Sequence, residues 1–282
     1  MKKTILMGLA LACATASFAQ ETKTKQSGAY LRLGLGYAFA HAGELYPSSV
    51  THTGASATYD LKKGSMGEGL SGVIAGGYKF NRNIALELGV GVGIAPKKLE
   101  STFTTSDPFS TETRVSKIGA KTPIYLMPAV VISTGNTLLE PYARVGLAVN
   151  VGGKLLQETD YTSTPVAGTP TKESYELTYK LRTGIGFQGA LGLKYHINNR
   201  VGLWLEAAGI SQNIYLKSGE LTKATVDGEN VLDTYTTSER KTNFEFKYTE
   251  VSGTASNEPS TASTVPFSFS NFGINLGVAF QF

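Results

Sequence analysis

The strongest constraint on the fold is an alternation of residue types that recurs along most of the chain. Its clearest example is the C-terminal segment from Phe272 to Phe282, where bulky apolar residues alternate with small or polar ones. Successive side chains of a β-strand point to opposite faces, so this segment predicts a strand with one apolar face and one small or polar face. A soluble sheet can contain such a strand, and only its repetition is distinctive.

Eight segments show this pattern, and each has the roughly 9–11 residues that a tilted membrane strand needs. They are residues 29–39, 69–80, 84–95, 118–132, 138–151, 179–196, a segment that begins at Val201, and 272–282. Short polar turns between them alternate with long links at 41–67, 96–117, 152–178 and 211–264. Such long links are uncommon inside a compact domain. A barrel threaded through a bilayer explains them as outer loops opposite short periplasmic turns.

Residues 1–19 have the features of a secretory signal peptide. Lys2 and Lys3 precede a short apolar run, and Ser17, Phe18 and Ala19 form a small-x-small cleavage site. Acylation at Cys13 is the alternative, although the residues before it match the lipid-attachment pattern poorly. We therefore expect a signal peptide at 1–19, a periplasmic segment at 20–28 and a β-barrel at 29–282.

Composition narrows the class further. The whole chain carries 26 basic and 22 acidic residues, a balance that argues against nucleic-acid binding. Beyond the signal peptide no apolar stretch is long enough for a membrane helix, and no helical periodicity is present. The chain is predicted to be all-β. Residues 231–237 and 242–251 also resemble strands; they predict an outer hairpin or, as the alternative, a ten-stranded barrel.

These features together resemble the small outer-membrane β-barrels of Gram-negative bacteria, namely OmpX-like proteins and the transmembrane domain of OmpA. The resemblance covers residues 29–282 and implies an eight-stranded antiparallel barrel in the cell outer membrane. It implies contact with outer-membrane lipid and lipopolysaccharide. It also assigns the C-terminal aromatics Phe280 and Phe282 as the signal read by the assembly machinery. It says little about activity, because these barrels share architecture more than chemistry.

The inward face of the predicted barrel is charged. Six residues fall on that face in the periplasmic half of the wall: Arg32, Glu87, Glu140, Arg144, Lys194 and Glu206. Three are basic and three acidic, and buried charges are costly unless they pair. Small inward glycines leave room for them in a narrow barrel. The balance predicts a lumen plugged by ion pairs; a small porin or solute conduit is the alternative.

Two proline positions and the histidines complete the expectations. Pro123 and Pro128 lie inside one predicted strand, where each removes a ladder donor, and they predict either a bulge or a later start of that strand. His41, with Ser48 and Glu44 nearby, leaves a lipid A-modifying enzyme as a less favoured hypothesis, whereas His196 is expected to be solvated in a periplasmic turn.

No metal-ligand spacing is present, so neither metal nor cofactor is expected. We expect a non-enzymatic role in structure or in surface interaction, with the outer loops as a possible site for an extracellular partner.

Overall fold

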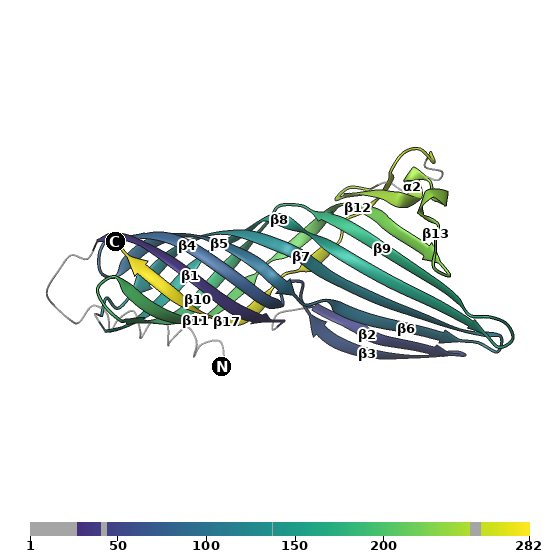
Figure 1. The fold of residues 1–282 in the computed structure, drawn as a ribbon, viewed down its shortest axis with the longest axis horizontal. Helices are drawn as coiled ribbons and strands as arrows, with labels where there is room; N and C mark the ends of the chain where they lie inside the picture. Colours follow the sequence, from purple (N-terminus) through teal and green to yellow (C-terminus); the bar gives the residue numbers. More distant parts are fainter. Residues whose placement is uncertain (1–26, 41–43, 137, 249–254) are drawn as a thin grey trace.

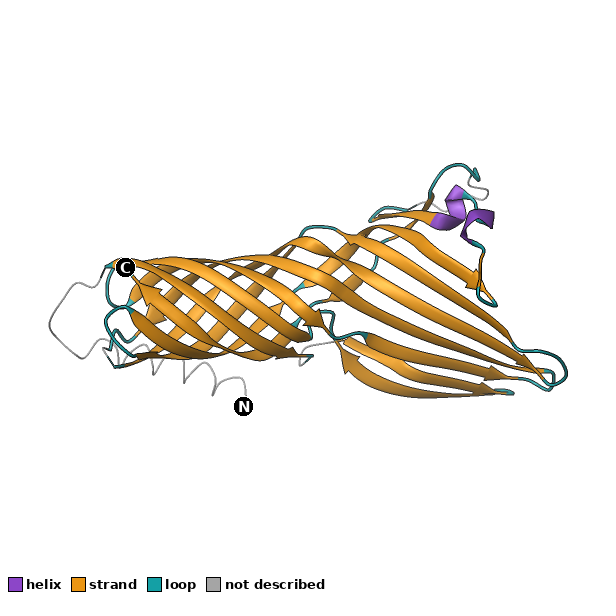
Figure 2. Ribbon diagram, viewed as in Figure 1, coloured by secondary structure: helices purple, strands orange, loops and turns teal. Residues whose placement is uncertain are grey.

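The structure is a computed structural model that describes residues 27–40, 44–136, 138–248 and 255–282. The predicted signal peptide lies outside the described residues. The prediction of an all-β chain is confirmed, because strands make up nearly all of the regular structure in the described part of the chain (Figure 2). Seventeen strands are present there, more than the eight that the alternation predicted.

The elements follow one another along the chain in this order: β1 (Gly28–Phe39), β2 (Glu44–Thr53), β3 (Ser56–Gly64), β4 (Gly69–Lys79), β5 (Ile84–Pro96), β6 (Leu99–Ser106), β7 (Ser110–Ser133), β8 (Leu139–Pro165), β9 (Thr171–Leu181), β10 (Gly184–His196), β11 (Val201–Ser211), β12 (Asn213–Val226), β13 (Glu229–Asn230), η1 (Leu232–Thr234), α2 (Thr237–Arg240), β14 (Lys241–Glu245), β15 (Ser260–Ser263), β16 (Pro266–Ser268) and β17 (Asn271–Gln281).

The strands pair into one large sheet, and part of this sheet closes on itself. β1 pairs with β4, and the antiparallel pairing continues through β5, β7, β8, β10, β11 and β17. The ring closes where β17 pairs with β1 over the whole length from Tyr30↔Gln281 to Phe39↔Phe272. Figure 1 shows these strands as the barrel on the left, with the C-terminus at one rim. A closed ring has no edge, so its backbone groups satisfy one another without water.

The barrel wall is apolar on the outside. Large residues such as Leu35, Ile74 and Leu276 are 55%, 48% and 62% exposed, and their neighbours in the sequence face the lumen. Aromatic pairs stand near the strand ends, with Tyr37 against Phe39 and Tyr78 against Phe80. An apolar belt with aromatic residues at its borders is typical of a wall in contact with lipid.

Most described residues of the predicted long loops are in strands, so that expectation was wrong. β7 and β8 continue beyond the barrel for totals of 24 and 27 residues, and β6 and β9 pair with their outer halves. β2 and β3 extend the sheet on one side, and β12, β14 and β15 extend it on the other. We call this open part the outer sheet (right in Figure 1). The backbone N–H and C=O groups of neighbouring strands form hydrogen bonds with each other. Segments with too little apolar surface to form a core of their own can therefore still be ordered.

Two further strand predictions need correction. The segment 179–196 is not one strand, because β9 ends at Leu181 and β10 begins at Gly184. The predicted hairpin of 231–237 and 242–251 is also wrong: η1 and α2 occupy most of its first arm. Of its second arm, the described residues contain β14, which pairs with β12 and β15 and not with the barrel. A capping box at Thr236 and Glu239 favours the short helix over a strand there.

The predicted bulge is present at Pro123 and marks the border between barrel and outer sheet. The β7–β8 register shifts around Ile124, and Thr122 and Gly153 have left-handed backbone, with φ of 48° and 108°. Tyr125 and Asn150 are buried on the barrel side of this point, while Ala120 and Leu155 are buried beyond it. The alternation of faces therefore reverses its phase in both strands.

An apolar cluster closes the outer mouth of the barrel. Phe269, Leu155 and Ile214 are fully buried and pack with Met66, Leu99, Ala120, Tyr125, Met127 and Leu216. The link before β4 is tied to the end of β16, because the Met66 N–H donates to the Ser268 carbonyl oxygen at 2.8 Å. The core of the molecule thus sits between the lumen and the outer sheet.

Candidate functional site

The barrel lumen contains two tiers of charged side chains. The upper tier joins Arg32 of β1, Glu87 of β5, Arg144 of β8 and Glu206 of β11. The Glu206 carboxylate accepts from Arg32 Nη2 at 2.9 Å and from Arg144 Nη2 at 2.6 Å. The Glu87 carboxylate lies 3.2 Å from Arg32 Nη1 and 3.8 Å from Arg144 Nε. These four side chains are almost fully buried, so each arginine bridges two carboxylates away from bulk water.

Aromatic and amide groups complete the upper tier. The Tyr30 hydroxyl donates to Glu87 and the Tyr142 hydroxyl donates to Glu206, both at 3.0 Å. The Arg32 guanidinium lies 4.2 Å from the centre of the Trp204 ring. Gln188 accepts a hydrogen bond from Arg144 Nη1 and anchors its own amide on the Leu147 carbonyl oxygen. The alternation along the strands put these residues on the inward face, but it did not indicate which of them would meet.

The lower tier is centred on Glu140 of β8, near the end of the barrel where β17 ends. Its carboxylate accepts from Lys79 Nζ at 2.8 Å and from the Ser133 hydroxyl at 2.6 Å. His196 Nε2 lies 2.8 Å from the same carboxylate, and Lys194 Nζ lies 3.9 Å from it. The expectation that His196 is solvated was therefore wrong, because its side chain is only 13% exposed.

Sequence reasoning missed the part that Lys79 plays. Its place on the inward face follows from the same alternation that identified the other charges, so the signal was available. With Lys79 included, the inward Lys, Arg and Glu residues of the barrel strands are four basic and three acidic. Of the two lysines in the lower tier, Lys79 lies 2.8 Å from the Glu140 carboxylate and Lys194 lies 3.9 Å from it.

Small residues make room for the network. A β-carbon at Gly34 would collide with the Trp204 ring, and one at Gly192 would collide with the Tyr142 ring. This agrees with the expectation that inward glycines accommodate bulky residues opposite. The lumen is consequently filled by side chains at the height of both tiers.

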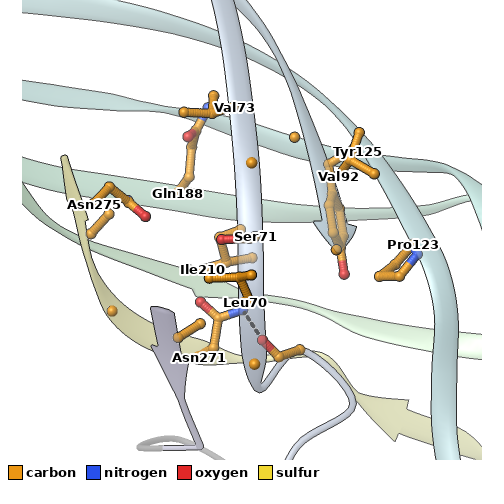
Figure 3. Close-up of a pocket in the computed structure, with 18 of the residues that line it drawn as sticks. Leu70, Ser71, Val73, Val92, Pro123, Tyr125, Gln188, Ile210, Asn271 and Asn275 are labelled. Carbon is orange, nitrogen blue, oxygen red and sulfur yellow. Dashed lines mark hydrogen bonds between the residues drawn. The ribbon is translucent and has the colours of Figure 1, made fainter. Parts of the chain in front are cut away.

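The space that remains is small. A cavity of about 90 Å³ lies between the upper tier and the apolar cluster, lined by residues that include Ser71, Tyr125, Gln188 and Asn275 (Figure 3). A second one of about 30 Å³ lies between the two tiers. Such volumes hold a few water molecules, whereas ligand pockets usually measure about 300–1,000 Å³.

The rim of the upper cavity carries one more ion pair. Glu68, just before β4, lines the cavity and accepts a hydrogen bond from Lys97 Nζ at 2.8 Å. This hydrogen bond raises the pKa of Lys97, which is mostly exposed. Glu68 precedes β4 and Lys97 follows β5, so both residues lie beyond the ends of the wall strands, and the pair ties these two strand ends together.

The remaining sequence candidates do not form a reactive constellation in the described chain. His41 lies outside the described residues, as does the side chain of Glu44, while the Ser48 hydroxyl donates to the Asp60 carbonyl oxygen. Within the described ranges no three His, Cys, Asp or Glu side chains are grouped as metal ligands. None of the described helices is both long and apolar enough to cross a bilayer.

The C-terminal aromatics have defined positions. Phe280 is paired with Leu31 of β1 and Val201 of β11 inside the wall. Phe282 follows the end of β17; its N–H donates to the Ala29 carbonyl oxygen at 3.0 Å, and its ring is 80% exposed. Phe282 is thus fixed by its backbone, while its side chain stays accessible at the barrel rim.

Comparisons with known proteins agree with this architecture. Residues 6–238 match the family model described as "Outer membrane protein beta-barrel domain". No curated protein matches. Among solved structures, the outer membrane protein OprG from Pseudomonas aeruginosa is similar, with 12% identity, a TM-score of 0.41, and coverage of 92% of this chain and 97% of OprG. That likeness is too low to transfer an activity. The family match covers most of the chain, which therefore belongs to the outer membrane β-barrel family and is a protein of the outer membrane.

Proposed function

We propose that this protein is a closed, eight-stranded membrane barrel whose role is structural or surface-interactive, with a lumen plugged by paired charges. The strand number rests on the ring of β1, β4, β5, β7, β8, β10, β11 and β17, each of at least 11 residues. A tilted strand crosses a bilayer in about 9–11 residues. The other strands lie beyond the barrel and extend the outer sheet.

The observation that carries the plug is the pairing in the upper tier. Arg32 and Arg144 both contact Glu206 and Glu87, so the four charges form one connected unit across the barrel. A permeating ion would have to separate buried pairs, and each separation leaves an uncompensated charge that costs several kcal/mol. The lower tier adds a second obstacle, because Glu140 of β8 contacts groups from three other strands, β4, β7 and β10.

The outer sheet supports a role at the cell surface. At about 3.3 Å per residue, strands of 24 and 27 residues reach roughly 80 and 90 Å, far more than the bilayer requires. The chain thus devotes about half of these two strands to structure outside the membrane. In the lumen the Ser133 hydroxyl donates to the Glu140 carboxylate, but both groups are buried inside the wall, and we propose a non-enzymatic role.

A small conduit is the second candidate, and one observation favours it. The two cavities lie on either side of the upper tier, so that tier alone separates them. If Arg144 or Glu206 moved, the two spaces could join into a longer water-filled path. Such a gate would still have to open the lower tier and the apolar cluster.

Planar-bilayer recordings of the pure protein separate the two candidates. We expect no steady conductance from the unaltered chain, and a measurable leak from the double variant Arg144→Ala/Glu206→Ala, which removes one basic and one acidic member of the upper tier. The matched control is Lys98→Ala/Glu158→Ala, an exposed pair on the outer sheet, and it should leave the membrane tight. A reproducible conductance of the unaltered protein that changes with Glu87→Ala would contradict the plug and establish the conduit.

A further inference from the structure

Three lysines stand side by side where the barrel passes into the outer sheet. Lys121 of β7 is the register partner of Lys154 of β8, and Lys154 is the partner of Lys180 of β9. The Cα atoms of directly opposed residues in antiparallel strands lie about 4.5–5.5 Å apart. All three side chains are exposed. We call them the lysine row.

The lysine row points away from the barrel axis. The adjacent row of the same strands, one residue further from the barrel, consists of Ala120, Leu155 and Tyr179. These residues belong to or pack against the apolar cluster at the mouth. Successive residues of a strand face opposite sides, so the lysines face outward. Figure 1 shows β7, β8 and β9 next to one another in this part of the sheet.

The bulges are what place the lysines there. Tyr125 and Asn150 face the lumen, and an unbroken alternation from them would direct Lys121 and Lys154 inward as well. The left-handed residues Thr122 and Gly153 reverse the phase in both strands. The bulges therefore lie at the level where an unbroken alternation would bury Lys121 and Lys154.

The charge of the row is uncompensated within the described chain. None of the three ammonium groups lies within ion-pair distance of a described carboxylate. By contrast, the next charged row outward is balanced: Lys98 pairs with Glu158 at 2.7 Å, Lys223 with Glu176 at 3.3 Å and Lys117 with Glu100 at 3.6 Å. Like charges directly opposite one another destabilise a sheet. A row of three is tolerated more readily if an anion from outside the chain lies against it.

The height of the row indicates where that anion comes from. Below it the outward face is apolar, with Ile124 and Val151 three residues from Lys121 and Lys154, and with Ile185 of β10 70% exposed. Three residues of a strand span about 10 Å. The lysines thus stand just above the lipid-contacting belt, where headgroups begin. From such a position the long lysine side chains can lay their stems along the apolar wall and place their ammonium groups among the headgroups.

We propose that the lysine row binds the phosphate groups of a phosphorylated glycolipid in the outer leaflet. Three ammonium groups on adjacent strands provide several N–H donors for phosphate oxygens, while the apolar wall below accepts the acyl chains. The site does not depend on whether the lumen conducts. It would fasten the border between barrel and outer sheet to the membrane surface.

Native mass spectrometry in a neutral detergent tests the site, with bisphosphorylated lipid A as the probe. The row variant Lys121→Gln/Lys154→Gln/Lys180→Gln should bind it about a hundredfold more weakly than the unaltered protein, if the three lysines contribute additively. The arginine variant of the same three positions keeps the charges and should retain binding. Mobility of unheated samples on a denaturing gel reports whether each variant is folded.

The matched control is Lys117→Gln/Lys172→Gln/Lys223→Gln, which removes the same charge from the outward face further from the membrane; it should bind lipid A normally. Dephosphorylated lipid A should bind the unaltered protein as weakly as lipid A binds the row variant. Equal affinity of the row and control variants for lipid A would overturn the proposal. So would equal binding of the dephosphorylated lipid. Displacement of lipid A by inorganic phosphate at a similar concentration would identify free phosphate as the ligand and overturn the lipid assignment.

Discussion

The barrel and the outer sheet share two strands, β7 and β8, yet they are built inside out with respect to each other. In the barrel the buried inward face carries charges such as Arg144, and the outward face is apolar. In the outer sheet the inward face carries Leu155 and its apolar neighbours, and the outward face carries the lysine row. The barrel is apolar on its outward face because lipid surrounds it. The outer sheet is apolar on its inward face because water surrounds it. Two bulges suffice to exchange the faces.

The two regions also treat their edges differently. The barrel closes through β1 and β17, so none of its strands has a free edge within the ring. The outer sheet is open, and its β3 edge strand is exposed almost throughout and carries Asp60, Lys62 and Lys63. Charged edges discourage pairing with other chains. On the outward face, one row across five strands contains only threonine: Thr58, Thr51, Thr104, Thr113 and Thr162.

The largest expected difference between the regions concerns carboxylates. Glu206→Gln removes the charge that both Arg32 and Arg144 contact in the lumen, and breaking such a buried pair costs roughly 3–5 kcal/mol of unfolding free energy. Glu176→Gln breaks the exposed pair with Lys223 and should cost less than about 1 kcal/mol. Urea unfolding in lipid vesicles, followed through the fluorescence of Trp204 beside Arg32, measures both. Equal costs would show that the lumen is as hydrated as the outer sheet.

A smaller effect is expected at the border. Gly153→Val places a branched side chain at a φ of 108°, with its β-carbon 2.8 Å from the Pro123 Cα, and should cost about 1–3 kcal/mol. Hydrogen exchange should show faster opening of β6 and β9, while the barrel strands stay protected. Gly76→Ala is the control, because a β-carbon there meets no other atom. If exchange rises equally in barrel and outer sheet, the two regions are one cooperative unit.

The smallest effect concerns the rim pair of Lys97 and Glu68. Lys97→Gln should reduce thermal stability by less than about 1 kcal/mol, because Lys97 is mostly exposed and water screens the pair. The raised pKa of Lys97 sets the sign of the pH dependence. Its contribution is complete below the ordinary lysine range and is lost as the pH rises through the raised pKa. Melting curves of both forms should therefore converge only in strongly alkaline buffer; a difference that vanishes near neutral pH would contradict this assignment.

Much of the barrel was predictable because alternation is a local property. The segments around 29–39, 69–80 and 84–95 correspond closely to β1, β4 and β5. The same alternation assigned Arg32, Glu87 and Glu206 to one face. It could not identify their partners, because residues 55 and 174 positions apart meet only once the ring has closed with its particular register.

The outer sheet was not predictable in the same way. Its segments are rich in threonine and serine, and alternation extends into it only in short stretches such as Tyr175, Leu177 and Tyr179, so the local pattern favoured loops. Those segments become strands because β7 and β8 present unpaired edges beyond the barrel, which β6 and β9 can extend. His196 was misjudged for a related reason: its position next to a turn was visible, but the Glu140 carboxylate reaches it from 56 residues away.

The sequence by itself determined the all-β class, the positions of the wall strands and the charged character of the lumen, because a two-residue period is set by the geometry of each strand alone. Only the tertiary structure decided which charges pair, where the faces exchange and how far the sheet continues outside. Those features depend on ring closure and on register between distant strands, and no local pattern encodes either of them.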